Sequence, residues 1–379
     1  MSLGVKLLAR ILHITECFGA GSFRSITLLC NRLSDLGHDV SIGYSRRAET
    51  PEHAQQFLRN AVKLYPLPLQ REISVTDIRS LLSLVRFIKD QGPDIVHLHS
   101  SKAGFLGRLA ALIARQQSRV FYSPRGLAFL NPEMAFISRH IYHALEFVGA
   151  RFGGTIVACS QSEYVAAKRL LQPSALALVE NAVDVSQVPR RPGSQTDGIE
   201  IVTSGRLSLQ KKPWVFARVA RELSPRFPRA TFTWIGDGDV GREVLLDAGV
   251  AVTGWLSPDD ALQKVARADI YLQTSGMEGM PIALIEAQVA GVPAVVTDVV
   301  GNRDVVSDGT TGYIAKNEGI MLEKVANLCA SSELRDELGS RARELGLVRF
   351  SPDRLISDYE RLYFQGDART PSVVNAGCV

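Results

Sequence analysis

The sequence has no long apolar run and little that marks a targeting segment. No stretch of about 18 uncharged apolar residues occurs in the chain, so no membrane-spanning helix is predicted. Lys6 and Arg10 interrupt the apolar residues at the start, and no cleavage site of small residues follows, so the start does not resemble a signal peptide. We therefore expect a protein that stays in the cytoplasm.

Cysteine is scarce as well. The chain has five cysteines, an odd number, and no two of them have the short spacing of a zinc site or a redox pair. They are Cys17, Cys30, Cys159, Cys329 and Cys378. We interpret them as reduced and mostly structural.

Neither sign of charge dominates the whole chain, because 43 Lys and Arg face 39 Asp and Glu, for a net charge of +4. The halves differ, however. Residues 1–190 hold 22 basic and 14 acidic residues, a net of +8, and residues 191–379 hold 21 and 25, a net of −4. A basic N-terminal half suits an acidic substrate or an anionic membrane surface, and a merely solvated surface explains it equally well. We expect no nucleic acid as a partner.

What the sequence does contain is a regular alternation of strand-like apolar runs with helical patterns. At 379 residues the chain exceeds the usual size of one core, so two domains are expected. The alternation predicts an α/β architecture of doubly wound parallel sheets, which bind ligands at the carboxyl ends of their strands. The expected parts are an N-terminal domain (1–187), a linker (188–198), a C-terminal domain (199–350), and a last helix that crosses back to the N-terminal domain and ends in a tail (351–379).

The most informative stretch is residues 275–286, which read Ser-Gly-Met-Glu-Gly-Met-Pro-Ile-Ala-Leu-Ile-Glu after a strand-like run. Pro281 suits the first position of a helix, and the apolar residues after it begin a helical face. Unpaired N–H groups at a helix start favour a phosphate, whereas Glu278 and Glu286 favour neutral hydroxyls. A phosphate beside hydroxyls points to a nucleotide sugar.

Two glutamates separated by seven residues, with Gly279 and Pro281 between them, resemble the signature of the retaining family 4 glycosyltransferases of the GT-B fold. Three other segments are similar to motifs of that family. Residues 205–211 resemble its Arg/Lys pair, residues 181–184 its interdomain Asn-Gly-Val-Asp, and residues 21–24 its N-terminal glycine loop. The similarity runs from residue 19 to about residue 312.

The resemblance implies two Rossmann-like domains that face a central cleft, the first for an acceptor and the second for a nucleotide-sugar donor. Arg206 and Lys211 would stabilise the departing diphosphate, and Glu278 would contact the transferred sugar. The implied donor-binding residues are Gly21, Asp237, Gly279, Met280, Pro281 and Glu286, the last of these for the ribose hydroxyls. The implied donor is a UDP sugar rather than a GDP sugar, with no cofactor and no metal.

The acceptor side is implied by segments similar to those of polysaccharide-assembling members. The candidates are Arg24, which could serve the donor phosphates instead, and His99, Ser101 and Lys102, although hydroxyls at a helix start also act as N-caps. Arg125 stands where the family commonly has a histidine. A permanent cation can bind a phosphate or a hydroxyl but cannot titrate as an imidazole does. Arg125 is therefore an acceptor-side candidate whose role the resemblance does not settle.

Two patterns invite a metal interpretation. His97 and His99 point to the same face of a strand, but no third ligand lies close in sequence, and a hydrogen-bonded core pair is the commoner outcome. Residues 237–239, Asp-Gly-Asp, copy the manganese motif of the other large glycosyltransferase fold, and a glycine turn at a strand end explains them. No metal site is expected.

The overall hypothesis is a retaining glycosyltransferase of bacterial surface polysaccharide synthesis. It would act on a lipid-linked saccharide, loosely held on the inner face of the cytoplasmic membrane by its basic half. The alternatives are a sugar-nucleotide epimerase or a phosphorylase-like enzyme of the same fold, and an inactive homologue that serves as a scaffold. The sequence does not identify the sugar, the acceptor or the oligomeric state.

Overall fold

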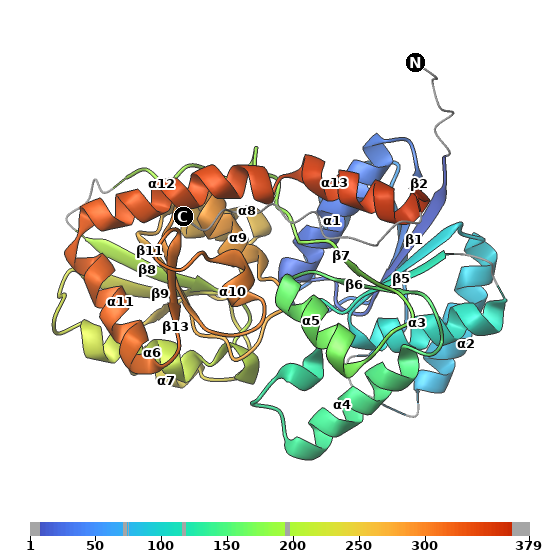
Figure 1. Ribbon diagram of the computed structural model, residues 1–379, viewed down its shortest axis with the longest axis horizontal. Coiled ribbons are helices and arrows are strands. Elements are labelled where there is room, and N and C mark those ends of the chain that lie inside the picture. The colour runs from blue at the N-terminus through green and yellow to red at the C-terminus, as the bar shows by residue number, and fades with distance from the viewer. Residues whose placement is uncertain (1–7, 71–73, 75, 116–118, 194–197, 366–379) are drawn as a thin grey trace.

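Two parallel β-sheets, each covered by helices, lie side by side in the computed structural model (Figure 1). The structure describes residues 8–70, 74, 76–115, 119–193 and 198–365. Residues 194–197 of the expected linker, and the tail with Cys378, lie outside the described residues. The predicted fold class, α/β with two doubly wound parallel sheets, is confirmed.

The first sheet has seven strands in the order β3-β2-β1-β4-β5-β6-β7, and every neighbouring pair is parallel. Its strands are β1 Arg10–Thr15, β2 Asp39–Tyr44, β3 Lys63–Pro66, β4 Ile95–His99, β5 Arg119–Ser123, β6 Thr155–Ala158 and β7 Leu176–Leu178. The helices are α1 Ala20–Asp35, α2 Asp77–Gln91, α3 Ser101–Ala114, α4 Phe136–Gly149 and α5 Gln161–Leu170, with 3₁₀ turns at Ala54–Phe57 and Ala128–Leu130.

The second sheet has six strands in the order β10-β9-β8-β11-β12-β13, again all parallel. Its strands are β8 Ile199–Ser204, β9 Ala230–Ile235, β10 Ala251–Val252, β11 Ile270–Gln273, β12 Ala294–Thr297 and β13 Gly312–Ala315. The helices are α6 Pro213–Leu223, α7 Arg242–Leu246, α8 Pro258–Arg267, α9 Ile282–Ala290, α10 Asn302–Val305, α11 Glu318–Ala330, α12 Ser332–Arg349 and α13 Pro352–Glu360, with short helical turns at Leu209–Lys211 and Arg361–Gln365.

Central strands of both sheets are buried on both faces, which is why they read as continuous apolar runs in the sequence. The edge strands β3 and β13 depart from this apolar pattern. β3 is exposed or half-buried throughout, and β13 is a short run that begins with a glycine. An edge strand buries less surface, so its sequence carries a weaker signal.

Helix starts follow local capping chemistry. Ser160 caps α5, because its hydroxyl accepts a hydrogen bond from the backbone N–H of Glu163 at 3.2 Å. Pro281 lies one position earlier than predicted. It is the N-cap of α9, with ψ at 121°, and the first helical residue is Ile282. The proline nitrogen carries no hydrogen and needs no hydrogen-bond partner at either position, so the presence of proline does not distinguish the N-cap from the first helical residue.

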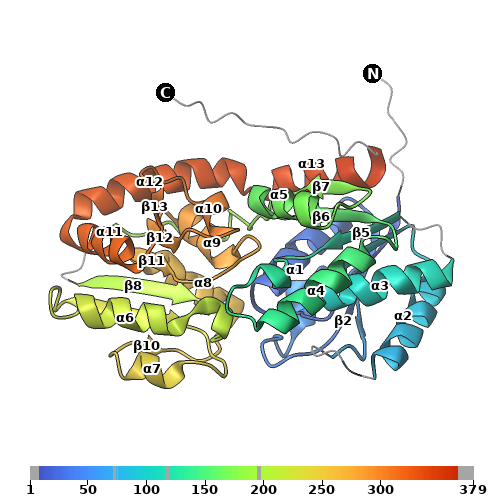
Figure 2. The ribbon, with the colours of Figure 1, turned by 60° about the horizontal axis from the view of Figure 1, so that its bottom comes forward.

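The last helix leaves the second half and packs on the first. α12 runs along the second half and α13 along the first (Figure 2). Leu355, Tyr359, Leu362 and Tyr363 are buried in one apolar cluster with residues of α1 and β1. Burying such side chains stabilises the contact by about 1.5–3 kcal/mol each. The two halves are thus connected twice, by the segment that follows β7 and by α13. Among the described residues, no helix is both long enough and apolar enough to cross a membrane.

In each sheet the strand order reverses once, between β1 and β4 in the first and between β8 and β11 in the second. Ligands of open parallel sheets bind at such reversals, in the crevice beyond the carboxyl ends of the strands. The loops that follow β8 and β11 carry residues 205–211 and 274–281, which are the segments that the sequence marks as functional.

Candidate active site

A cavity of about 990 Å³ lies between the two halves, at the carboxyl ends of both sheets. From the first half it is lined by the loops after β1, β2 and β5, and from the second half by the loops after β8, β9 and β11. Of the residues predicted for the site, Gly21, Arg24, Arg125, Arg206, Lys211, Glu278, Gly279, Met280, Pro281 and Glu286 line it.

Two cations from the β8 loop reach this cavity. Lys211 Nζ lies 2.7 Å from Glu278 Oε1, and the same oxygen accepts a hydrogen bond from Gln273 Nε2 at 3.0 Å. Gly205, at φ 155°, leaves room for this lysine, because a Cβ there would lie 2.9 Å from Lys211 Cε. Arg206 is half-buried and makes no ion pair with the described part of the chain. The predicted Arg/Lys pair and the first glutamate are therefore brought together.

The N-terminus of α9 also opens into the cavity, because Gly279 to Ala283 form part of its wall. The first N–H groups of a helix lack partners within the helix, and together with the helix dipole they favour an anion. α9 has nine residues and is almost entirely buried, so its position is fixed by packing. Cations and a helix start thus converge on one region of the cavity.

Glu286 of α9 is paired across the cavity with Arg24 of α1. Arg24 Nε lies 2.6 Å from Glu286 Oε1, and Arg24 Nη1 donates to the carbonyl oxygen of Pro258 at 2.6 Å. Burial raises the pKa of Glu286, and the Arg24 guanidinium opposes this rise. The resemblance implied Glu286 for the donor and left Arg24 open between the donor phosphates and the acceptor. The structure places the two side chains in direct contact.

Arg125 and Gly126 form a tight turn against the loop that begins α9. Arg125 has φ at 57°, which costs a non-glycine residue roughly 1–2 kcal/mol. A Cβ on Gly279 would lie 2.5 Å from the carbonyl carbon of Arg125, so only glycine allows this approach. Asn181 Nδ2 also donates to the carbonyl oxygen of Met280 at 2.8 Å. The turn and Asn181 therefore hold the two halves together beside the cavity.

Four predicted site residues, His99, Ser101, Lys102 and Asp237, are not among the residues that line this cavity. His99 is fully buried in the first sheet. Ser101 lies beside the buried Tyr122 and Glu146. Lys102 pairs with Asp77 at 2.6 Å, with only 8% of its side chain exposed. Side chains at the end of β4 and the start of α3 thus pack into the first half and do not reach the cavity.

Asp237 is the fourth of these residues. Its Oδ1 accepts hydrogen bonds from Arg242 Nη1 at 2.7 Å and from the backbone N–H of Gly238 at 2.9 Å. Gly236 lines the cavity, whereas Asp237 lies outside its lining. The carboxylate is therefore engaged by an arginine of its own half.

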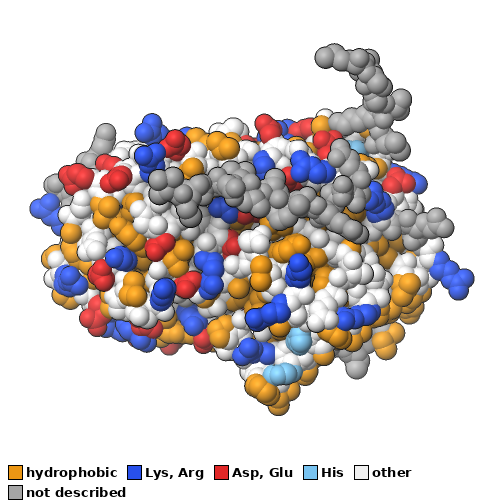
Figure 3. All heavy atoms as spheres, in the orientation of Figure 1, with side chains coloured by type: hydrophobic (Ala, Val, Ile, Leu, Met, Phe, Trp, Pro, Cys, Tyr) orange, Lys and Arg blue, Asp and Glu red, His pale blue; other side chains and the backbone are white. Residues whose placement is uncertain are grey.

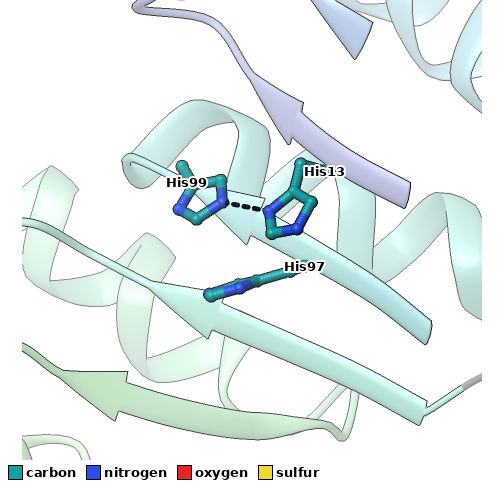
Figure 4. A group of neighbouring side chains, drawn as sticks. All are labelled: His13, His97 and His99. Atoms are coloured by element: carbon teal, nitrogen blue, oxygen red, sulfur yellow. Dashed lines mark hydrogen bonds between the residues drawn. The ribbon is translucent and has the colours of Figure 1, made fainter. Parts of the chain in front are cut away.

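His99 belongs to a cluster with His13 and His97 at the ends of β1 and β4 (Figure 4). One ring nitrogen from each of the three histidines lies within 4.8 Å of the other two, which is close enough for the three to hold one metal ion. Among the described residues, this is the group of possible metal ligands with such spacing. His97 is already bonded, however, to Tyr363 Oη at 2.6 Å through Nδ1 and to Ser123 Oγ at 2.8 Å through Nε2. The pair predicted from the sequence is thus a hydrogen-bonded core pair with a third member from β1.

Several cavity residues carried no sequence-based role. Arg46 follows β2 at the same sheet edge, Gln210 donates to the carbonyl oxygen of Met277 at 2.8 Å, and Trp255 lines the second half. The rule that ligands bind at the carboxyl ends of parallel strands would have found Arg46. Trp255 lies beyond β10, a strand of two residues whose end is hard to place from sequence.

The structure has two doubly wound parallel sheets that face one cavity, and cations and a helix N-terminus lie beside each other in the cavity wall. This arrangement defines the GT-B class of transferase fold. Comparisons with known proteins agree with this class. The structure of HepE from Anabaena in complex with UDP-glucose has a TM-score of 0.73 and 18% identity, and the match covers 93% of this chain and 99% of that chain.

Sequence comparisons are more specific. The family model Glycosyltransferase Family 4 matches residues 19–187, and the model Glycosyl transferases group 1 matches residues 184–345. An Escherichia coli UDP-Gal:alpha-D-GlcNAc-diphosphoundecaprenol alpha-1,3-galactosyltransferase is 28% identical over 282 residues, 68% of this chain and 72% of the relative. The capsular polysaccharide biosynthesis glycosyltransferase CapM of Staphylococcus aureus is 23% identical over 325 residues, 78% of this chain and 83% of the relative.

The two family models together span both halves of the fold and the cavity between them. The chain therefore belongs to the family 4 glycosyltransferases, with a group 1 domain as its second half, as its sequence motifs predicted.

Proposed function

We propose that this glycosyltransferase moves a sugar from a UDP sugar to a lipid-linked saccharide, with retention of the anomeric configuration and without a metal. The observation that carries the proposal is the convergence of Arg206, Lys211 and the N-terminus of α9 on one region of the cavity. Glycosyl transfer leaves negative charge on the departing diphosphate, and preorganised positive groups stabilise that charge.

The magnitudes fit a reaction without a metal ion. A hydrogen bond to a charged group contributes about 1.5–3 kcal/mol, so two cations and a helix start replace much of the charge that a divalent ion would supply. Neither carboxylate of the Asp-Gly-Asp segment lines the cavity, and Asp237 already accepts a hydrogen bond from Arg242. Activity is therefore expected to persist in a strong chelator, and a complete loss that manganese restores would contradict this part of the proposal.

Relatives support the choice of substrates. The E. coli relative is named for UDP-galactose as donor and a diphosphoundecaprenol-linked sugar as acceptor, and HepE was solved with UDP-glucose. The S. aureus relative is named for capsular polysaccharide biosynthesis. A UDP sugar and a lipid-linked acceptor of bacterial surface polysaccharide synthesis are therefore the substrates that we propose.

The outer face of α4 supports a peripheral position on the inner face of the cytoplasmic membrane. Ile137, Ile141 and Val148 recur at helical spacing on this face and are 73%, 49% and 47% exposed, whereas a solvated helix face is normally polar. Figure 3 shows hydrophobic and histidine side chains together at the tip where α4 lies in Figure 1, with Lys and Arg side chains close by. An apolar stripe with cations at its margin fits a surface of anionic lipid headgroups.

The transfer itself is tested by incubating the purified protein with single UDP sugars and a short lipid-diphosphate-linked saccharide. Release of UDP and a product whose new linkage keeps the donor's anomeric configuration by NMR would support the proposal. An inverted linkage would contradict retention. Slow UDP release without any acceptor separates an active enzyme from an inactive scaffold, and formation of a free epimerised nucleotide sugar would indicate the epimerase alternative.

A further inference from the structure

Arg125 is joined to the buried histidines by a directional chain of hydrogen bonds. Arg125 Nε lies 3.2 Å from His99 Nδ1, and His99 Nε2 lies 3.0 Å from His13 Nδ1. Both histidines are fully buried, and Figure 4 shows the bond between them within the sheet. The cavity residue Arg125 is therefore anchored in the core of the first half.

Which atom donates in each of these hydrogen bonds follows from the chemistry of arginine. A guanidinium only donates hydrogen bonds, so His99 Nδ1 accepts and the ring proton of His99 is on Nε2. His13 Nδ1 then accepts in turn, and the proton of His13 is on Nε2, which has no hydrogen-bond partner in the described part of the chain. Burial lowers the pKa of His13 to about 3 and holds the pKa of His99 well below its usual value, so both rings stay neutral.

This hydrogen bonding also argues against a metal at the cluster. Metal binding would need free lone pairs on ring nitrogens. The lone pair of His99 Nδ1 faces Arg125 Nε, that of His13 Nδ1 faces the proton of His99, and both nitrogens of His97 are bonded to Tyr363 and Ser123. The cluster is built to receive a cationic side chain rather than a metal cation.

The far end of Arg125 points the other way, into the wall of the cavity. Its Nη1 donates to Ser25 Oγ at 2.7 Å and lies 3.5 Å from Asn181 Oδ1. Its Nη2 makes no hydrogen bond with any described residue, and the side chain is half-buried where it lines the cavity. Three protein contacts thus fix the guanidinium plane and leave one edge for a ligand.

We infer that His99 is a positioning residue that acts through Arg125, holding the free edge of its guanidinium toward a phosphate oxygen of a bound substrate. The inference rests on the proposed function in that the cavity is the site of transfer. His99 does not touch the substrate. Its acceptor nitrogen selects one orientation of a side chain that otherwise has four rotatable bonds.

The test compares two substitutions of nearly the same shape. His99→Asn keeps an acceptor oxygen close to the position of Nδ1, and His99→Leu removes it. We expect His99→Leu to lower kcat/KM by about tenfold or more, because misplacing a reacting group by about 1 Å can cost a hundredfold. We expect His99→Asn to stay within about threefold of the original protein, since the bond to Arg125 Nε is kept. Equal losses in both variants would overturn the inference.

A double-mutant cycle separates positioning from stability. If His99 acts through Arg125, adding His99→Leu to Arg125→Ala leaves kcat/KM within about twofold of Arg125→Ala alone, because the two effects are not additive. Losses that multiply would contradict the inference. If His99→Leu does not fold, the same cycle with His99→Ala, which also removes the acceptor nitrogen, decides the question by the same criterion.

His97 is the matched control, since it lies in the same cluster and is bonded to Tyr363 and Ser123 rather than to Arg125. His97→Leu should lower the melting temperature without a selective loss of kcat/KM, and a loss as large as that of His99→Leu would overturn the inference. Arg206→Ala separates a failure of the positioning role from a failure of the proposed function. If Arg206→Ala abolishes transfer while Arg125→Ala does not, the proposed function stands and the positioning role fails. If neither substitution affects transfer, the proposed function fails as well.

Discussion

Lys211 and Lys212 are adjacent in the sequence but differ in their partners. Lys211 pairs with Glu278 in the cavity wall, and Lys212 pairs with Glu133 of the first half at 2.8 Å. Lys212 is also the residue just before α6 and has φ at 49°. Of the two lysines, Lys211 lines the cavity and Lys212 does not.

Lys211→Ala and Arg206→Ala are therefore expected to lower turnover by about a hundredfold or more, because each removes a donor aimed at developing negative charge. The fold should remain intact by circular dichroism, since both side chains line a cavity. Steady-state release of UDP measures the effect.

Lys212→Ala is the control, and a mild effect is expected. The pair with Glu133 is partly exposed, and such pairs contribute about 0–1 kcal/mol. A neutral Lys211→Ala beside a severe Lys212→Ala would show that the motif was assigned one residue out of register.

Gly279 is the other residue whose environment makes a sharp prediction. In Gly279→Ala the new Cβ would lie 2.5 Å from the carbonyl carbon and 2.6 Å from the next backbone nitrogen, at Arg125 and Gly126. Neither backbone atom can move as a flexible side chain can. We expect a loss of turnover of about tenfold or more from displaced reacting groups, together with lower stability in urea unfolding.

Gly319→Ala serves as the comparison for Gly279→Ala. Gly319 lies in α11, is exposed, and has Asn317 Oδ1 3.4 Å from a built Cβ. Alanine there should be neutral or stabilise by up to about 1 kcal/mol, because glycine is a poor helix former. If both variants behave alike, the close approach at Gly279 does not matter for function.

At the scale of elements, α4 exposes apolar side chains on its outer face, among them Ile137, Ile141 and Val148. Arg151 stacks on Phe147, with Arg151 Cζ 3.5 Å from the centroid of the Phe147 ring, so an aromatic ring and a cation lie together at the edge of the apolar face of α4. Each Lys or Arg near an anionic leaflet contributes on the order of 1 kcal/mol, and buried apolar side chains add to the binding.

Ile137→Glu is expected to weaken co-sedimentation with anionic vesicles severalfold, because it adds a negative charge to the face that would meet the lipid. Val348→Glu should leave binding unchanged, because Val348 lies on α12 of the other half and is 76% exposed, close to the 73% of Ile137. Binding should also fall between 0.1 M and 1 M salt, as the screening length drops from about 10 Å to about 3 Å. Equal binding of both variants would show that α4 does not carry the contact.

At the scale of the whole molecule, the two halves meet through side chains at the cavity. Arg24 with Glu286, Lys212 with Glu133, and Asn181 with the carbonyl of Met280 all cross from one half to the other. A donor that binds in this cavity contacts both halves and so stabilises the whole folded chain.

UDP at a hundred times its dissociation constant should therefore raise the unfolding free energy by about 2.7 kcal/mol. The melting temperature should rise in a single transition with UDP and less with GDP. Lys211→Ala should shrink the shift, since it removes a phosphate contact. No shift with any nucleoside diphosphate would contradict donor binding in this cavity.

The sequence by itself determined the parallel sheets, the loops after β8 and β11, and the residues of those loops that line the cavity. These follow from local rules, since apolar runs, glycine turns and a proline before an apolar helical face act over a few residues. Gly279, Lys211 and Glu278, which these local patterns singled out, line the cavity.

Only the tertiary structure decided which side chains meet across the fold. His99 and Lys102 looked available beside a strand end, but His13 and Asp77, each more than twenty residues away, enclose or pair with them. Arg24 and Glu286 are 262 positions apart and still form an ion pair. Burial and charge pairing depend on residues that packing brings from distant elements, and no spacing rule within one segment contains that information.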